Sequence, residues 1–243
     1  MDETRREYDE TALIQDRKQY IRRSIRARRR GLSEAERLAH SHRIWERVVG
    51  LPCYQHARVL LGYMAFDHEV LTDSLMQQAM ASGKQLVLPM VLGDRQEMAL
   101  YSIEDLRSDV APGYCGILEP QPQRTRVVAP ETLELALIPG VAFDLRGGRL
   151  GLGAGFYDRL LSRLPRDTPT VGLAFDFQVI PRLPLEPHDM VLQAIVTEHR
   201  VIWGSSWMQG EAAEGARFSH VAGEGERGEQ PWTQPLFSWR LER

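Results

Sequence analysis

The residues with the clearest chemical potential lie in one stretch, IPGVAFDLRGGRLGLGAGFYDRLL, which spans positions 138–161. Between an apolar run typical of a strand and a segment typical of a helix, it carries Gly147, Gly148, Gly151, Gly153 and Gly155. Glycine has no Cβ, so backbone N–H groups can crowd around an anion. The N-terminus of the following helix adds partial positive charge. Arg149 and Arg159 add full charges, and the stretch therefore predicts a polyphosphate site.

The spacing Gly151-x-Gly153-x-Gly155 matches neither the dinucleotide fingerprint G-x-G-x-x-G nor the G-K-[ST] ending of a P-loop. A structural loop that needs positive φ angles is the main alternative. Tyr157 and Asp158 favour a binding role, because a purely structural loop rarely needs an aromatic, an acid and two arginines at its helix junction. A sugar-phosphate isomerase is a further alternative. It would need an acid/base pair near the loop and no ATP.

A second candidate is the basic segment 17–30, which carries eight cations in fourteen residues. Lys18 and Arg22 are four residues apart, so a helix places both on one face and lets them reach one ligand together. A solvated helix face or an RNA-binding arm are the alternatives. Tyr20 is the segment's one aromatic residue and the chain's net charge is −3, which disfavours nucleic acid as a partner.

The elements that must position these residues follow from hydrophobic periodicity. Ser33 and Glu36 form a capping-box pattern, and the helix after them places Ala35, Leu38, Trp45 and Val49 on one face. Further helices are predicted at 72–83 and 156–164, and strands at 57–66, 85–91, 97–103, 133–143, 170–175 and 194–202. This alternation predicts an α/β fold. We expect a three-layer, largely parallel sheet with helices on both faces, preceded by a basic N-terminal helix.

Three parts of the 243-residue chain differ in composition. We expect a polar leader at 1–16, one domain at 17–203, and a flexible Gly/Glu-rich C-terminal tail at 204–243, whose aromatic residues could alternatively dock on the domain. Cys53 and Cys115 match no paired metal-ligand spacing, so we expect reduced thiols in a cytoplasmic protein. The charged N-terminus is unlike a signal peptide, and no window resembles a membrane span. We expect a monomer with no membrane partner.

The stretch PGVAFD…GGRLGLGAGFYDR resembles the signature of the 5-formyltetrahydrofolate cyclo-ligase family, also called methenyltetrahydrofolate synthetase. The resemblance extends to KQYIRRSIRARRRGLS (18–33), MAFDHEVLTDSL (64–75), GILEP (116–120) and LPLEPHDMVLQAIVTE (183–198), in the family's order. It covers roughly residues 18–202. The resemblance implies a soluble enzyme that takes ATP and 5-formyltetrahydrofolate as small-molecule substrates, with Mg²⁺ as cofactor.

Roles carry over residue by residue. The positions that match the family's ATP site are Lys18, Arg22, Arg149, Leu150, Gly151, Leu152, Gly153, Ala154, Gly155, Phe156 and Tyr157. Lys18 and Arg149 match its catalytic cations. Asp158 and Asp189 match its magnesium ligands, and two carboxylates suit Mg²⁺ when phosphate oxygens and waters complete the shell. A first-turn helix acid is the alternative role for Asp158, and His188 is expected to be a surface residue.

The folate end of the site is implied by three further matches. Glu69 matches the family's folate-binding glutamate, and a carboxylate can accept two N–H donors from a pterin ring. Met64 and Phe156 would line the pocket, because apolar walls suit a flat heterocycle. The alternatives are a helix N-terminal charge for Glu69 and ordinary core positions for the other two.

The family reaction converts 5-formyltetrahydrofolate and ATP to 5,10-methenyltetrahydrofolate, ADP and phosphate, through a phosphorylated formyl (imidate) intermediate. Several positions depart from the family pattern, namely Leu71, Met90, Leu152, Ala154, Phe156 and Gln193. These departures keep open a divergent, non-catalytic nucleotide- or folate-binding protein on the same fold. The retained Lys18, Arg22, Glu69, Asp158 and Asp189 favour the enzyme.

Overall fold

The computed structural model describes residues 3–93, 97–186 and 189–204. The helices are α1 (Glu3–Gly31), α2 (Glu34–Gly50), α3 (Pro52–His56), α4 (Asp73–Ala81) and α5 (Phe156–Leu161). The strands of the main sheet are β1 (Val59–Leu61), β2 (Gln85–Leu92), β3 (Glu97–Ile103), β6 (Arg126–Val127), β7 (Leu135–Ile138), β10 (Thr170–Leu173), β12 (Ala194–Val196) and β13 (Val201–Trp203). Two small sheets contain β4 (Val110–Pro112) with β5 (Leu118–Pro120), and β8 (Ala142–Asp144) with β9 (Arg149–Leu150) and β11 (Val179–Ile180).

The main sheet has the order β13-β12-β10-β7-β1-β2-β3-β6. Its five central strands, from β12 to β2, pair in parallel, and β3, β6 and β13 add antiparallel edges. The parallel centre reads as near-continuous apolar runs because both of its faces are covered. The predicted α/β class with a largely parallel sheet is confirmed.

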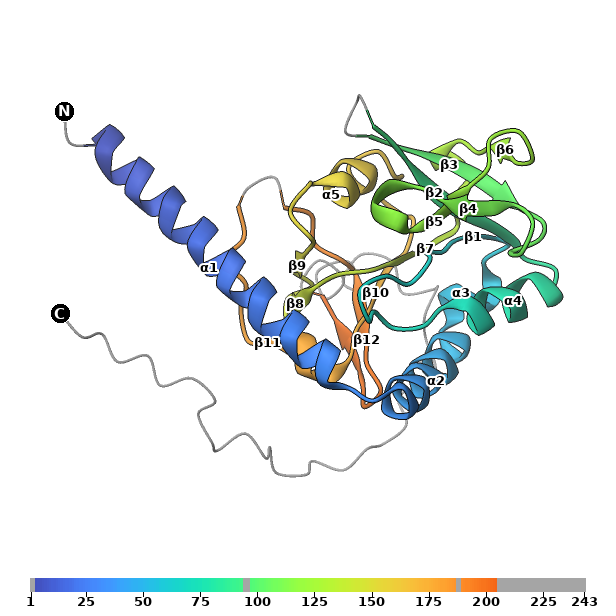
Figure 1. Cartoon of the computed structure of the whole chain (residues 1–243), viewed down its shortest axis with the longest axis horizontal. Coiled ribbons are helices and arrows are strands. Elements are labelled where there is room, and N and C mark those ends of the chain that lie inside the picture. The colour runs from blue at the N-terminus through green and yellow to red at the C-terminus, as the bar shows by residue number, and fades with distance from the viewer. Residues whose placement is uncertain (1–2, 94–96, 187–188, 205–243) are drawn as a thin grey trace.

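Alternate side chains of the central strands enter two different cores. Leu60 and Leu135 pack with α2, α3 and α4 on one face, whereas Leu61 and Ala136 pack with α5 on the other. Figure 1 shows α2, α3 and α4 together below the sheet and α5 above it. The basic helix α1 crosses one side of the molecule, packs Ile25 against the small sheet of β8 and β9, and projects beyond the body.

The chain reverses its direction across the sheet between β1 and β7. From β1 it passes to β2 and β3 on one side, and it returns to β7, β10 and β12 on the other. The loops after β1 and β7 therefore diverge, which leaves a crevice at the carboxyl ends of the two strands. Ligands of open α/β sheets bind at such points.

Several details differ from the sequence predictions. The strand predicted at 133–143 is divided into β7 of the main sheet and β8 of a small sheet. The segment 1–16, predicted as a leader, is helical from Glu3 as part of α1. The strand predicted at 194–202 is two antiparallel strands, β12 and β13, because Thr197 closes a turn by accepting the amide of Arg200. Helix α2 buries Ser41, Ile44, Trp45 and Val48, so Trp45 of the predicted face is buried as expected, whereas Leu38 is 52% exposed. The capping box at Ser33 and Glu36 is present as predicted.

The predicted tail falls almost entirely outside the described residues, which end at Gly204. Within the described part of the chain, no helix combines the length and apolar character needed to cross a membrane.

Candidate active site

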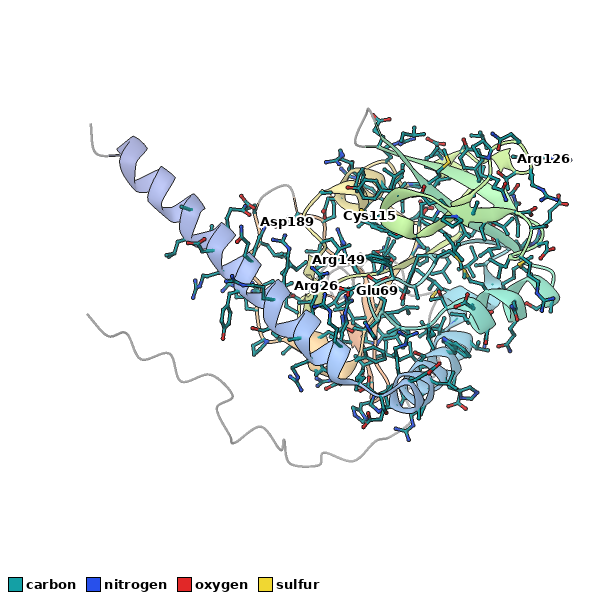
Figure 2. All side chains as sticks on the ribbon, in the orientation of Figure 1. Arg26, Glu69, Cys115, Arg126, Arg149 and Asp189 are labelled. Atoms are coloured by element: carbon teal, nitrogen blue, oxygen red, sulfur yellow. The ribbon has the colours of Figure 1, made fainter. Side chains whose placement is uncertain are left out.

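A cavity of about 830 Å³ occupies the crevice at the carboxyl ends of β1 and β7. Tyr63 and Met64 reach it just after β1, and Pro139 and Gly140 reach it just after β7. The glycine-rich turn, α1 and the loop that carries Asp189 close its sides. In Figure 2, Glu69 and Arg149 lie near the centre of the molecule and Asp189 lies beside α1, whereas Arg126 is far away on β6.

The glycine-rich turn joins β9 to α5 along the rim of this cavity. Gly153 has φ 115° and Gly155 has φ 69°, both in a region that side chains with a Cβ rarely adopt. The alternative of a turn that needs positive φ is thus correct as a description of its backbone. It does not exclude a binding role, because the whole turn lines the cavity. Helix α5 has only six residues, so its dipole is weak and the arginines carry most of the positive charge.

Arg149 and Asp158 form an ion pair within the cavity wall. Nη2 of Arg149 donates to Oδ2 of Asp158 at 2.9 Å, and Nη1 donates to the Pro139 carbonyl at 3.4 Å. Arg149 is 3% exposed, and among the described residues its buried Nε has no hydrogen-bond acceptor. An unpaired buried N–H is unfavourable. An anionic ligand in the cavity would supply the missing acceptor.

Lys18 and Asp189 form a second ion pair on the α1 side. Nζ of Lys18 lies 2.6 Å from Oδ2 of Asp189 and 2.7 Å from Oε2 of Glu186, and the lysine is 3% exposed. A buried ammonium needs such partners because its desolvation is unfavourable. Asp189 is held by the amide of Glu186 at 2.8 Å.

Two further arginines bind backbone carbonyls of the glycine-rich turn. Nε of Arg22 donates to the Gly151 carbonyl at 2.9 Å, and Nη2 of Arg159 donates to the Ala154 carbonyl at 2.7 Å. Burial lowers the pKa of Arg22, and the charge of Asp189 opposes that effect. The turn is therefore tied to α1 from one side and to α5 from the other.

Glu69 lines the same cavity, away from the Lys18–Asp189 pair but near enough to Arg149 for the two charges to interact. Burial raises the pKa of its carboxyl to about 7, although the charge of Arg29 and the amide of Phe66 pull it down. Oε2 accepts the Phe66 amide at 3.1 Å, and Oε1 lies 3.7 Å from Nη1 of Arg29. Near neutral pH this carboxyl is close to its titration midpoint, so a small change in its surroundings changes its charge.

The walls near Glu69 are aromatic and apolar. Met64 and Phe156 line the cavity, and Phe156 contacts Tyr114 edge-on with ring centroids 5.5 Å apart. Burial and the charge of Glu69 raise the pKa values of Tyr63 and Tyr157, so both phenols stay protonated. A flat heterocycle with N–H donors would find apolar walls and an acceptor here.

The structure thus brings the sequence-predicted site residues to one cavity. They are Lys18, Arg22, Met64, Glu69, Arg149, Leu150, Gly151, Leu152, Gly153, Ala154, Gly155, Phe156, Tyr157, Asp158 and Asp189. Leu150 also packs in a core cluster with Ile25, which makes it chiefly a structural residue. His188 lies outside the described residues.

Sequence reasoning missed four polar residues in or behind this cavity, Arg29, Tyr63, Asp67 and Glu186. Arg29 appeared only as one cation of a basic run. Glu186 is 168 positions from Lys18 in the chain, so no local pattern links them. Asp67 and Glu186 lie in segments that the family resemblance covers, and that was the one available signal for them.

Two of the departures from the family pattern have structural roles. Oε1 of Gln193 accepts the Thr170 amide at 3.2 Å, which joins β12 to β10. The side chain of Leu71 packs partly buried against the core cluster that contains α2, and its backbone accepts from Trp45 at 2.5 Å and donates to Ser41 at 3.0 Å. Both residues stabilise the frame around the cavity.

Comparisons with known proteins agree with this geometry. A sequence model described as the 5-formyltetrahydrofolate cyclo-ligase family matches residues 14–198. The 5-formyltetrahydrofolate cyclo-ligase of Escherichia coli K12 is 32% identical over 178 residues, which cover 73% of this chain and 98% of that protein. The enzyme of the same name from Mus musculus is 29% identical over 190 residues, covering 74% and 93%.

Solved structures give the same result. The NMR structure of Aquifex aeolicus 5,10-methenyltetrahydrofolate synthetase superposes with a TM-score of 0.67 at 32% identity, covering 86% of this chain and 99% of that one. The 5,10-methenyltetrahydrofolate synthetase from Mycoplasma pneumoniae gives 0.61 at 26% identity, covering 74% and 98%. Sequence and fold comparisons agree, and the chain belongs to the 5-formyltetrahydrofolate cyclo-ligase family.

Proposed function

We propose that this chain converts 5-formyltetrahydrofolate to 5,10-methenyltetrahydrofolate in an ATP- and Mg²⁺-dependent reaction that releases ADP and phosphate. The observation that carries the proposal is the composition of the cavity at the carboxyl ends of β1 and β7. One end contains paired cations and carboxylates beside the glycine-rich turn, and the other contains a buried glutamate between apolar walls. The cytoplasmic location and the monomeric state stay predictions.

The phosphate end of the cavity suits a triphosphate. Lys18, Arg22 and Arg149 approach it from α1 and β9, and each is already held by an internal acceptor. Held side chains lose little further entropy when a ligand arrives, so they are preorganised for an anion. Nε of Arg149 offers an additional donor, unpaired among the described residues.

A divalent cation would be held by Asp158 and Asp189. Oδ1 of Asp158 accepts the amide of Met190 at 3.4 Å, so the neighbouring Asp189 lies close by. The described residues contain no group of three or more His, Cys, Asp or Glu side chains placed to bind a metal. A two-carboxylate site fits Mg²⁺, which takes its remaining ligands from phosphate and water. When bound, Mg²⁺ would neutralise phosphate charge and orient the γ-phosphate.

The folate end would hold the pterin ring. Glu69 would accept N–H donors of the ring, and Met64 and Phe156 would cover its faces. The task of the chain is then to align the formyl oxygen with the γ-phosphate, because the effective concentration gained by alignment contributes many powers of ten in rate.

Two bond-making steps follow. The formyl oxygen attacks the γ-phosphorus and ADP departs, which leaves a phosphorylated imidate. Nitrogen-10 then attacks the carbon of the former formyl group. The bond between that carbon and the phosphorylated oxygen breaks with release of phosphate, and nitrogen-10 loses its proton. Lys18 and Arg149 would stabilise the charge that develops on the transferring phosphoryl group. No protein nucleophile is required.

A near-ultraviolet absorbance assay tests the proposal, in a band where methenyltetrahydrofolate absorbs and its precursor does not. Purified protein is mixed with 5-formyltetrahydrofolate, Mg²⁺ and ATP, and omission of ATP is the control. We expect ATP-dependent growth of the product band with stoichiometric phosphate release. ATP and folate binding by calorimetry without any product would instead establish the non-catalytic binding protein.

A further inference from the structure

The turn that carries Glu69 has an unusual backbone. Asp67 has φ 45° and His68 has φ 61°, and neither is a glycine. Residues with a Cβ adopt this left-handed region uncommonly, although Asp and His enter it more readily than most, and two such residues in succession are stabilised by contacts with their surroundings. The turn is closed by the Glu69 amide, which donates to the Phe66 carbonyl at 3.0 Å. Strained turns of this kind cluster at binding sites, where the surrounding structure stabilises them.

Three arginines of α1 hold the turn through Asp67. Nε of Arg26 lies 2.6 Å from Oδ2 of Asp67, Nη2 of Arg29 lies 3.1 Å from the same oxygen, and Nη2 of Arg30 lies 3.4 Å from Oδ1. Burial would raise the pKa of Asp67, but the hydrogen bond and charge of Arg26 and the charges of Arg29 and Arg30 outweigh it and lower the pKa. Asp67 is therefore a stable anion that ties the turn to α1.

Arg29 lies between the carboxylate of Asp67 and the carboxyl of Glu69 in the cavity. It is 0% exposed, and its Nη1 is also 3.5 Å from the Gly140 carbonyl after β7. Its Nε is buried without a hydrogen-bond acceptor among the described residues. A fully buried guanidinium is unfavourable unless opposite charges face it. Asp67 supplies that charge, so Arg29 can stay beside Glu69.

We propose that Asp67 and Arg29 are positioning residues for Glu69: they hold its turn in the left-handed conformation and set the electrostatic environment of its carboxylate. This inference rests on the proposed role of Glu69 in folate binding. The groups that face Glu69 are Arg29 from α1, Asp67 in its own turn, Arg149 from β9, Tyr63 after β1 and Tyr157 from α5. The two tyrosines are uncharged near neutral pH, so burial is the main cause of the raised pKa of Glu69, and the arginines and Asp67 are the charges that modify it.

The two charges act on Glu69 in opposite directions. The positive charge of Arg29 lowers the pKa of Glu69, and the negative charge of Asp67 raises it. Arg29→Gln should therefore move the titration of Glu69 to higher pH, and Asp67→Asn should move it to lower pH. Simple loosening of the turn would instead admit water and move both titrations the same way, toward the ordinary glutamate value.

The experiment measures the affinity for 5-formyltetrahydrofolate, and separately for ATP, by calorimetry from pH 5.5 to 8.5 in the full chain. The four proteins are wild type, Asp67→Asn, Arg29→Gln and Arg23→Gln. Arg23 is an exposed residue of the same helix, so its variant controls for the loss of one charge from α1. We expect Asp67→Asn to weaken folate affinity about tenfold at pH 8 while ATP affinity stays within about twofold. The pH midpoint of folate affinity should shift to higher pH in Arg29→Gln and to lower pH in Asp67→Asn. Arg23→Gln should match wild type in both affinity and midpoint.

Midpoints that shift in the same direction, or equal losses of folate and ATP affinity, would overturn the inference in favour of a merely structural role. If Arg29→Gln fails to fold, Asp67→Asn still tests the inference, because wild-type folate affinity with an unmoved midpoint, or equal losses of folate and ATP affinity, would overturn it. Absence of folate binding by the wild type would instead refute the proposed function, so the two failures are distinguishable.

Discussion

The two ends of the cavity treat charge in opposite ways. At the phosphate end, Lys18 and Arg149 are paired with Asp189 and Asp158 at 2.6 and 2.9 Å. At the folate end, Glu69 is 8% exposed, lies 3.7 Å from its nearest cation, and has a pKa raised to about 7. At the phosphate end, the ion pairs are internally neutralised. A bound triphosphate can replace the carboxylates as the partner of the cations, and a divalent cation can bind the carboxylates. The folate end keeps a carboxyl poised between charged and neutral, which suits a neutral ring with N–H donors.

The largest effect should come from the phosphate end. Asp158→Asn removes a carboxylate that we assign to Mg²⁺ and leaves Arg149 without its ionic partner. We expect turnover in the absorbance assay to fall by at least about 100-fold, because electrostatic stabilisation of the transferring group is lost. Folate affinity should change little. Asp167→Asn, at an exposed position, is the matched control; an unaffected rate in Asp158→Asn would remove Asp158 from the metal site.

Lys18→Gln tests the other ion pair at this end. The variant loses a charge-assisted contact to phosphate, worth about 1.5–3 kcal/mol, so ATP affinity should fall about 10- to 100-fold. It also leaves Glu186 and Asp189 facing each other without their shared cation. Calorimetric titration with ATP and with 5-formyltetrahydrofolate separates the two ends, and Arg17→Gln, at the exposed neighbouring position, is the control. An equal loss of folate affinity would contradict the division of the cavity.

Glu69→Gln should produce the reverse pattern at the folate end. Folate affinity should fall about tenfold or more, with ATP affinity retained. The free energy of unfolding should rise at pH 8, because the native state no longer holds a buried carboxylate whose pKa is raised from 4.5 to about 7. That shift destabilises the wild type by up to about 3 kcal/mol above pH 7, and the penalty disappears as the pH falls toward 4.5.

Urea denaturation at pH 8 and pH 5 tests whether Glu69→Gln raises the free energy of unfolding. The difference in unfolding free energy between Glu69→Gln and wild type should be positive at pH 8 and smaller at pH 5. The exposed Glu97→Gln is the control for loss of a surface charge. A Glu69→Gln protein that is less stable at pH 8 would show that the carboxylate is well compensated, and the contrast between the two ends would then be wrong.

The smallest effect should come from the backbone of the glycine-rich turn. Gly153→Ala places a Cβ at φ 115°, which costs about 1–2 kcal/mol locally. We expect the KM for ATP to rise about three- to tenfold with little change in that for folate. Gly50→Ala is the control, since a Cβ at Gly50 meets no atom within 4 Å. A rise in both KM values would mean that the turn also shapes the folate end.

Local chemistry made much of this molecule predictable. The glycine spacing, the capping box and the alternation of apolar segments predicted the turn, the start of α2 and the α/β class. The predictions of element boundaries and of buried helix faces were least accurate, because the hydrophobic pattern at those positions fits more than one structure. One apolar run at 194–202 could not reveal the turn between β12 and β13. The buried face of α2 depends on which neighbours it meets, so the sequence favoured Leu38 where the structure buries Ile44.

The sequence by itself determined which side chains were available and how they are spaced along each element, because helix and strand periodicity are local properties. Only the tertiary structure decided which charges meet. Lys18 meets Glu186 and Asp189 across more than 160 residues, and Arg29 meets Asp67 across 38. Burial then changed the chemistry of Glu69, raising its pKa to about 7. Desolvation and long-range pairing depend on packing of the whole chain, which no local pattern encodes.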